Sequence, residues 1–555
     1  MANYDFFITS SLEKVFPNIR PVALTQSLST TLEEKISVQL CYFLESPSEV
    51  YPPKSFKVEV KGDVEEVQLR NVELIASQLP CTENNDQYYL STTPGLFPDL
   101  LTPNNGIIRP LFNQFKSLWV DFKFSKPGVK KLTFNLTECG NEYYNGQELP
   151  KELLEFTAPL TLEVIDKKLP KFDIIHTEWF HSDCLADYYN VEAWSEKHWA
   201  IVQNFIKTAN KDCYINAILT PIFTQPLDTQ VNGERTTVQL CNIFLDKGQY
   251  SFDFSLLARW CAICKAEGIE YLELAHLFTQ WGAQKTPKIF VKENGKLVKK
   301  FGWHVDATDS EYRKFLEAFL PALIKQLNLL GYDKQHLLFH ISDEPTEAQL
   351  ESYKKAKDMV ADLLKGCTIV DALSSFEFYK KGVIENPIPA NDHIQPFIDN
   401  GVENLWTYYC VAQGSLVPNR FFSLPSARNR IMGLLMYYYN IKGFLHWGYN
   451  FYNSAYSINH INPYTNSTAG NFFPSGDAYL VYPASNYEAL LSLRAEVQTD
   501  GFDDYRALRL LEKKMGREYV ISLIDKQVGY KITFKHYPRS SQFLLEFRNT
   551  INTLL

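Results

Sequence analysis

Several features that assign a chain to a common functional class are missing from these 555 residues. No run of about 18 consecutive apolar residues is present, so we expect no transmembrane helix. The first residues, MANYDFFITSSLEKVFP, contain no basic segment followed by an apolar one, so we expect no signal peptide and a cytoplasmic protein. A formal net charge of -9 disfavours nucleic acid or an anionic membrane surface as the main partner.

Cysteine motifs and nucleotide-binding motifs are also scarce. Ten cysteines are few for this length, and without export they are expected to be free thiols. The C-x-x-C of Cys261 and Cys264 has no second pair or histidines at zinc spacing, and it shares a helical face with Leu257 and Trp260, which predicts a buried helix face. No G-x-G-x-x-G or P-loop turn occurs. We therefore predict no metal and no cofactor.

What the chain does contain is an aromatic share of 14% and two successive periodicities. Tyrosine and tryptophan suit sugar recognition because they combine an apolar face with a polar edge. Residues 1–168 repeatedly alternate apolar and polar positions, as at Ile36, Val38 and Leu40, which is typical of half-buried strands. We predict an all-β sandwich domain over 1–168.

Over residues 169–484 the pattern alternates between strands and helices. The predicted strands lie at 172–176, 214–219, 269–274, 336–341, 367–370, 404–408, 443–447 and 479–482. This alternation predicts a parallel α/β sheet, and the strand count fits a (β/α)8 TIM-type barrel. A doubly wound open sheet is the alternative, although it lacks its usual turn motifs. Residues 485–555 are predicted to be a helical C-terminal region that closes the barrel, so the chain as a whole is multidomain.

The stretch His336-Leu-Leu-Phe-His-Ile-Ser-Asp-Glu-Pro345 organises the rest of the chain. An apolar strand ends there in Asp343 and Glu344, and the carboxyl ends of parallel strands are where such folds place their chemistry. Neighbouring residues of a regular strand point to opposite faces, so both acids reach one pocket only if the backbone twists. The alternative is that the pair caps the following helix, whose dipole favours carboxylates.

The chemistry that suits this pair is glycoside hydrolysis, which commonly uses two carboxylic groups. The predicted strand at 443–447, where many retaining barrels carry the nucleophile, reads Gly443-Phe-Leu-His-Trp-Gly-Tyr-Asn450 and has no carboxylate. A sugar with a 2-acetamido group can supply its own carbonyl oxygen instead. Asp343 would then hold the acetamido N–H and stabilise the oxazolinium charge, and its own charge would raise the pKa of Glu344, the acid.

Five segments, in one order across most of the chain, resemble glycoside hydrolase family 123, the β-N-acetylgalactosaminidases, including the region known as domain of unknown function 4091. They are Thr177-Glu-Trp-Phe-His-Ser-Asp-Cys-Leu-Ala-Asp-Tyr-Tyr189, His340-Ile-Ser-Asp-Glu-Pro345, 443–450, 476–483 and 492–505. The resemblance implies a β-sandwich, a catalytic barrel and substrate-assisted hydrolysis of β-linked GalNAc. It also implies that Asp343 stabilises the oxazoline and that Glu344 is the acid/base.

The remaining candidate sugar contacts lie on the predicted strands or in the loops that follow them. They are His181, Asp183, Asn216, His276, Trp406, Tyr408, His446 and Trp447. A loop-stabilising pair is the alternative for His181 and Asp183, and core packing is the alternative for Trp406 and Tyr408. Since His446 and Trp447 are adjacent on a strand, one of them is expected to face the site. Trp281, in a long loop, is a candidate subsite wall.

The sequence therefore predicts a retaining β-N-acetylhexosaminidase that acts on small carbohydrates. Two alternatives stay open at this point. One is a glycosidase of another sugar with a nucleophile not yet identified. The other is a non-catalytic saccharide-binding protein that retains the barrel.

Overall fold

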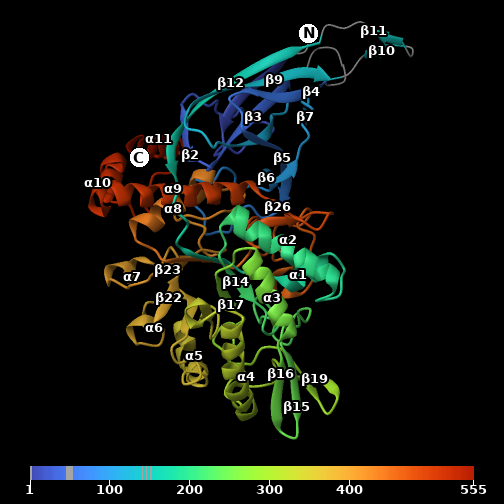
Figure 1. The fold of residues 1–555 in the computed structure, drawn as a ribbon, viewed down its shortest axis with the longest axis vertical. Helices are drawn as coiled ribbons and strands as arrows, with labels where there is room; N and C mark the ends of the chain where they lie inside the picture. The colour runs from blue at the N-terminus through green and yellow to red at the C-terminus, as the bar shows by residue number, and fades with distance from the viewer. Residues whose placement is uncertain (1–2, 46–53, 140–141, 145–146, 150–152) are drawn as a thin grey trace.

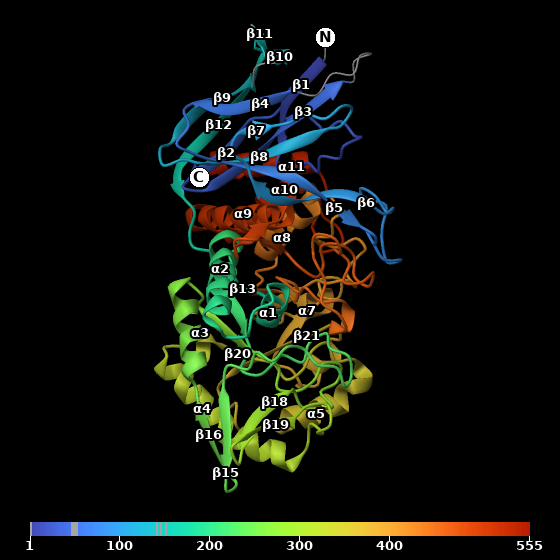
Figure 2. The same ribbon diagram turned by 90° about the vertical axis from the view of Figure 1, so that its right-hand side faces the viewer.

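The computed structural model describes residues 3–45, 54–139, 142–144, 147–149 and 153–555. It comprises a β-rich N-terminal region, a nearly closed eight-stranded parallel barrel and a set of C-terminal helices (Figures 1 and 2). This confirms the multidomain organisation expected from the change in periodicity. None of the helices in the described ranges is long and apolar enough to cross a bilayer.

The N-terminal region contains two five-stranded sheets. One has the order β1 (Asn3–Ser10), β3 (Lys35–Glu45), β8 (Lys116–Lys123), β5 (Glu66–Ser77), β6 (Gly95–Pro103). The other has the order β2 (Leu28–Leu32), β12 (Glu155–Lys168), β9 (Gly128–Cys139), β4 (Ser55–Gly62), β7 (Ile107–Ile108). Their inward side chains meet, with ring centroids of Tyr4 and Phe56 4.9 Å apart. The apolar positions of the alternating pattern therefore form the core between the sheets.

The barrel strands are all parallel to their neighbours. In chain order they are β13 (Ile175–Glu178), β14 (Ala217–Thr220), β17 (Tyr271–Leu274), β20 (Leu337–Phe339), β21 (Thr368–Leu373), β22 (Asn386–Pro389), β23 (Trp406–Tyr408) and β24 (Gly443–His446). β24 pairs with β13, and a bridge between Ala390 and Tyr408 connects β22 to β23. The barrel is nearly closed because this last junction is a single bridge.

Helices follow the barrel strands in turn. They are α1 (Ser182–Tyr188), α2 (Glu196–Cys213), α3 (Ser255–Ala266), α4 (Ser310–Leu329), α5 (Leu350–Asp358), α6 (Glu377–Lys380), α7 (Gln395–Asp399) and α8 (Ser426–Tyr438). α3 buries Leu257, Trp260, Cys261 and Cys264 on one face, as their spacing predicts. The helix expected directly after Pro345 begins later, at Leu350, after the 3-10 turn η2 (Glu347–Gln349).

Two strand predictions were wrong. β22 was missed because its sequence is Asn-Pro-Ile-Pro, and the two prolines lack the amide donors that a strand pattern implies. The strand predicted at 479–482 lies outside the barrel, where β25 (Val481–Pro483) pairs antiparallel with β26 (Ala489–Leu491). The strands predicted sixth and seventh, β23 and β24, are consequently the seventh and eighth of the barrel.

A further sheet extends from the barrel at the end farthest from the N-terminal region (Figures 1 and 2). It consists of β15 (Asn242–Asp246), β16 (Gln249–Asp253), β18 (Ile289–Glu293) and β19 (Lys296–Phe301). Its strands come from the loops that follow β14 and β17. These long loops are thereby folded into structure of their own.

The C-terminal helices are α9 (Leu493–Met515), α10 (Arg517–Val528) and α11 (Ser541–Leu554). α9 lies between the barrel and the N-terminal sheets (Figure 1). On the sheet side, the buried carboxylate of Glu496 lies 2.6 Å from Arg70 of β5 and 2.5 Å from Lys35 of β3. On the barrel side, a Cβ at Gly433 of α8 would lie 1.7 Å from the carbonyl oxygen of Gly501, so glycine permits close packing of the two helices.

The Glu496 cluster yields a test of stability. Burial acts to raise the pKa of Glu496, but Arg70 and Lys35 outweigh it and hold that pKa at about 2. Replacement of Glu496 by Gln leaves two cations facing a neutral group, so we expect a loss of about 3–5 kcal/mol in the free energy of unfolding at pH 7, measured by urea denaturation. Because the folded-state pKa is depressed, this contribution is present above the unfolded pKa and lost as pH falls towards 2.

Glu512→Gln on the same helix is the matched control. Glu512 pairs with Arg509 at 3.0 Å, and both side chains are partly exposed. We expect that substitution to cost less than about 1 kcal/mol. Equal losses in the two variants would contradict the role assigned to Glu496.

Candidate active site

A pocket of about 210 Å³ opens beside the carboxyl ends of the barrel strands. Three carboxylates line it: Asp228, Asp343 and Glu344. Half of the remaining lining residues are Trp, Tyr or Phe, and these are Trp179, Trp281, Tyr408, Trp447, Tyr456, Phe472 and Phe473. A lining with many flat apolar faces and a few charged groups is typical of a small-molecule site.

Asp343 and Glu344 both reach this pocket because of the backbone between them. Glu344 has a φ of 41°, in the left-handed region that non-glycine residues rarely adopt. This turn breaks the strand alternation that would otherwise aim the two side chains in opposite directions. The helix-capping alternative does not hold, because Thr346 occupies the N-cap of the next turn and its capping box is completed by Gln349.

The environment of the pair favours the protonated form of each carboxyl. Burial raises the pKa of Glu344, an effect partly opposed by the Tyr408 hydroxyl, which donates to Glu344 Oε1 at 2.5 Å. Burial and the charge of Glu344 raise the pKa of Asp343 well above its usual value. Two adjacent carboxyls in such a site titrate as a unit that retains one proton over a wide pH range.

Asp228 is a third carboxylate that sequence reasoning missed. It lies in the long polar loop after β14, and its Oδ2 accepts a hydrogen bond from the backbone N–H of Tyr456 at 3.0 Å. Ser457 Oγ also donates to the Asp228 carbonyl oxygen at 2.7 Å. Burial raises the pKa of Asp228 to about 6. Asp228 thus attaches the Tyr456 loop to the pocket wall and places an acid in the pocket.

The predicted aromatic contacts divide between the pocket and the barrel interior. Tyr408, Trp447 and Trp281 line the pocket, and Trp281 is 38% exposed at its mouth. Trp447 Nε1 donates to Asp477 Oδ2 at 3.1 Å, which orients the indole. Trp406 lies deeper in the barrel: a Cβ at Gly443 would lie 1.9 Å from its ring, so the close approach requires glycine there.

His181 lines the pocket, and its neighbour Asp183 does not. His181 Nδ1 accepts from Arg235 at 3.0 Å, and its Nε2 lies 2.9 Å from the carbonyl oxygen of Trp447. Burial and the Arg235 charge lower the pKa of His181 to about 3, so its imidazole is neutral. Asp183 forms a buried two-point ion pair with Arg235 at 2.7 and 2.8 Å, the loop-stabilising arrangement.

Asn216 and His446 make internal contacts away from the pocket lining. Asn216 Oδ1 accepts from the backbone N–H of His176 at 2.8 Å and its amide donates to the carbonyl oxygen of Ile174 at 3.0 Å. His446 Nδ1 accepts from Arg420 at 2.8 Å. Their assignment as sugar contacts stays an untested prediction.

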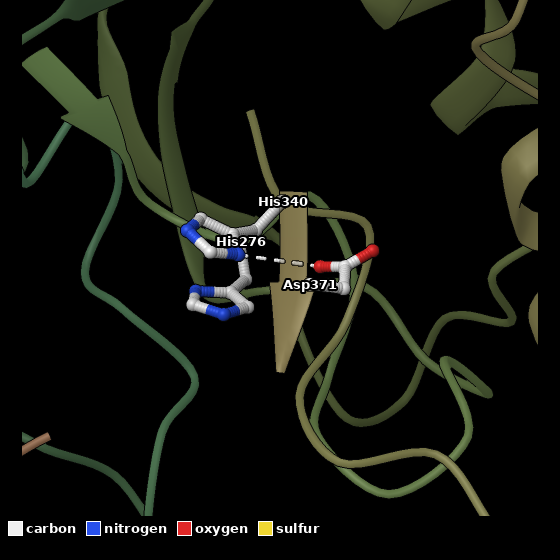
Figure 3. Close-up of side chains that lie close together, drawn as sticks. All are labelled: His276, His340 and Asp371. Atoms are coloured by element: carbon white, nitrogen blue, oxygen red, sulfur yellow. Dashed lines mark hydrogen bonds and ion pairs between the residues drawn. The ribbon is translucent and has the colours of Figure 1, made fainter. Parts of the chain in front are cut away.

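His276 belongs to a buried group with His340 and Asp371, shown in Figure 3. The two imidazole rings stack with centroids 4.3 Å apart at 18°, so their lone pairs lie in nearly parallel planes. A tetrahedral metal site instead needs ligand lone pairs that converge on one point. His340 Nε2 and Nδ1 also face Glu273 at 2.6 Å and Asp371 at 3.2 Å. This arrangement fits an ion-pair network better than a metal centre.

The model of the glycoside hydrolase 123 catalytic domain matches residues 179–511 of the chain. This protein belongs to glycoside hydrolase family 123. A family 123 glycoside hydrolase from Clostridium perfringens has a similar structure, with a TM-score of 0.71 at 14% identity, over 99% of this chain and 98% of that one. At that identity the likeness concerns the fold, while the family match shows a glycoside hydrolase.

Other structures resemble this family 123 chain only distantly. The family 2 β-galacturonidase of Eisenbergiella tayi has a TM-score of 0.32 at 10% identity, over 90% of this chain and 97% of that one. The xylanase 10B modules of Clostridium thermocellum have a TM-score of 0.31 at 11% identity, over 88% of this chain and 99% of that one. Neither supports any conclusion about this family 123 chain. No curated protein matches the sequence.

The bond between Tyr408 and Glu344 predicts a shift in pH dependence for this family 123 hydrolase. Tyr408→Phe removes a donor that favours the ionised form of Glu344, so the pKa of Glu344 rises. We expect the alkaline limb of the pH profile for glycoside hydrolysis to move up by about one unit. Tyr449→Phe is the control, because that buried hydroxyl donates to the carbonyl oxygen of Phe205 at 2.9 Å, away from the pocket. An unshifted limb in Tyr408→Phe would contradict this role.

Proposed function

We propose that this family 123 hydrolase is a retaining β-N-acetylhexosaminidase, with terminal β-linked GalNAc as its sugar, acting by substrate assistance. Asp343 stabilises the acetamido group and Glu344 is the general acid/base. The observation that carries the proposal is the pair of adjacent carboxyls exposed to one aromatic pocket. Each has a raised pKa, which suits a site that must hold one proton and one charge.

In the proposed first step, Glu344 gives its proton to the glycosidic oxygen as the bond to the anomeric carbon breaks. The acetamido carbonyl oxygen attacks that carbon, and an oxazolinium ion forms. Asp343 accepts a hydrogen bond from the acetamido N–H and offsets the developing positive charge. Glu344, now ionised, takes a proton from water, which opens the ring with net retention.

The pocket wall supports this assignment in two ways. Tyr408 fixes Glu344 by a 2.5 Å hydrogen bond, and Trp447 is held by Asp477, so acid and aromatic surface are positioned together. The seventh and eighth barrel strands, β23 and β24, carry no carboxylate. The related C. perfringens structure is described in terms of glycolipid glycan hydrolysis, which is compatible with removal of a terminal sugar.

A second candidate is a glycosidase of a plain sugar in which an enzyme carboxylate is the nucleophile. Asp228 favours it, because this acid lines the same pocket as Glu344. Substrate assistance remains the better account, because Asp228 already binds the backbone of Tyr456 and its raised pKa of about 6 makes it a weak candidate for a permanently ionised nucleophile at lower pH.

A panel of aryl β-glycosides separates the two candidates. We expect cleavage of the β-GalNAc or β-GlcNAc substrate and a rate at least about a hundredfold lower on β-galactoside, which lacks the internal nucleophile. Asp228→Asn should retain more than about a tenth of the wild-type rate, because it keeps a hydrogen-bond acceptor for Tyr456. Cleavage of the plain galactoside together with inactivity of Asp228→Asn would establish the second candidate, and failure to cleave any substrate would favour a saccharide-binding protein.

The two carboxyls of the pair should respond differently to the leaving group. Glu344→Gln is expected to lose about 10²–10⁴-fold on a substrate with a poor leaving group and far less on a dinitrophenyl glycoside, since the latter needs no proton. Asp343→Asn should lose rate on both. The comparison requires kcat/KM for both variants on both substrates, and equal losses of Glu344→Gln on the two would refute its acid role.

A further inference from the structure

His340 occupies an unusual position below the proposed catalytic pair. It follows β20, which lies between β17 and β21 in the barrel. Each of these neighbours directs a carboxylate at its ring: Glu273 Oε1 lies 2.6 Å from Nε2, and Asp371 Oδ1 lies 3.2 Å from Nδ1 (Figure 3 shows Asp371). All three side chains are fully buried.

This geometry favours the doubly protonated form of His340. A neutral imidazole has one N–H, whereas two carboxylate acceptors at opposite nitrogens need two. Both carboxylates act as acceptors elsewhere too: Glu273 receives Trp179 Nε1 at 2.8 Å, and Asp371 receives the backbone N–H of Ile341 at 3.1 Å. Burial opposes a charge on His340, but the bonds to Asp371 and Glu273 raise its pKa to about 10.

The charge of His340 lowers the pKa of Asp343, which follows it by three residues. The charges of Glu344, Asp371 and Asp228 all raise the pKa of Asp343, and His340 is the group that lowers it. Tyr408 meanwhile favours the ionised form of Glu344. The imidazolium is therefore a charge that favours an ionised Asp343, the form that the proposed chemistry needs.

We propose that the His340 imidazolium, clamped by Glu273 and Asp371, is a positioning residue that favours the negative charge on Asp343 that the proposed mechanism needs. This inference rests on the proposed function. His276 completes the arrangement as a neutral ring stacked on the cation, which avoids a second buried positive charge.

The test is the pH dependence of kcat/KM in His340→Gln, measured on dinitrophenyl β-GalNAc. This substrate needs an ionised Asp343 but no acid, so the acidic limb reports the pKa of Asp343. Loss of the imidazolium should move that limb up by at least about one unit. The rate should fall by about tenfold or more on the acidic side and recover at higher pH. A uniform loss across the profile would overturn the proposal, because a merely structural role predicts it.

His198→Gln is the matched control. This second buried histidine is neutral, since its Nδ1 accepts from the backbone N–H of Trp194 at 2.9 Å and its Nε2 faces the carbonyl oxygen of Ser182. The same substitution there removes no charge, so the acidic limb should stay in place. A limb that moves equally in both variants would overturn the assignment to His340.

A second measurement holds even if His340→Gln fails to fold. In wild-type protein with ¹⁵N in all 11 histidines, at least one imidazolium with slowly exchanging ring N–H protons should persist at pH 8.5. Absence of any such signal overturns the inference even if the enzyme cleaves acetamido sugars. Conversely, a persistent imidazolium signal in a protein that cleaves no acetamido sugar would refute the proposed function and still support a protonated His340.

Discussion

The left-handed backbone of Glu344 is the constraint on which the site depends. A non-glycine residue in this conformation costs on the order of 1 kcal/mol and persists only where its surroundings impose it. Here the backbone N–H of Trp281 donates to the Asp343 carbonyl oxygen at 3.1 Å, and Ser342 Oγ donates to the Thr279 carbonyl oxygen at 2.8 Å. The loop after β17 thus holds the end of β20 in the turn that brings two acids to one pocket.

The charges around the pocket are arranged so that this pair is not neutralised. The nearby cations have their own partners: Arg235 binds Asp183, and Arg420 binds Glu178 at 2.7 Å. His181 on the wall is neutral. The pair therefore keeps its raised pKa values, and the charge of the buried His340 favours the ionised form of Asp343. In the proposed mechanism, this combination lets one carboxyl donate a proton while its neighbour remains charged.

The sequence was most informative where structure is local. Apolar runs with turn residues after them located seven of the eight barrel strands, and the Asp343–Glu344 pair stood out because it ends such a run. β22 was not predicted, because its two prolines interrupt the strand pattern. The alternation of side chains along a strand predicted that only one of Trp447 and His446 faces the site. It gave no such distinction between Trp406 and Tyr408, because both lie on the same face of their strand at different depths in the barrel.

The remaining pocket residues could not be predicted because their positions depend on how long loops fold. Asp228, Tyr456 and Phe472 lie in segments without periodicity, and they meet only when the loop after β14 binds the one after β24. The left-handed backbone of Glu344 also has no local sequence signal. Pro345 made a turn there plausible, but the contacts that impose it come from the Trp281 loop.

The central proposal is that the amide of the bound sugar, rather than an enzyme side chain, attacks the anomeric carbon. Aryl β-GalNAc substrates whose acetamido methyl carries zero, one, two or three fluorines test it most directly, because fluorine weakens the carbonyl oxygen as a nucleophile and hardly changes its size. We predict that kcat/KM falls steadily along the series, by about a hundredfold or more, which is about 3 kcal/mol in the barrier. Rates that stay within about threefold across the series would contradict participation of the amide.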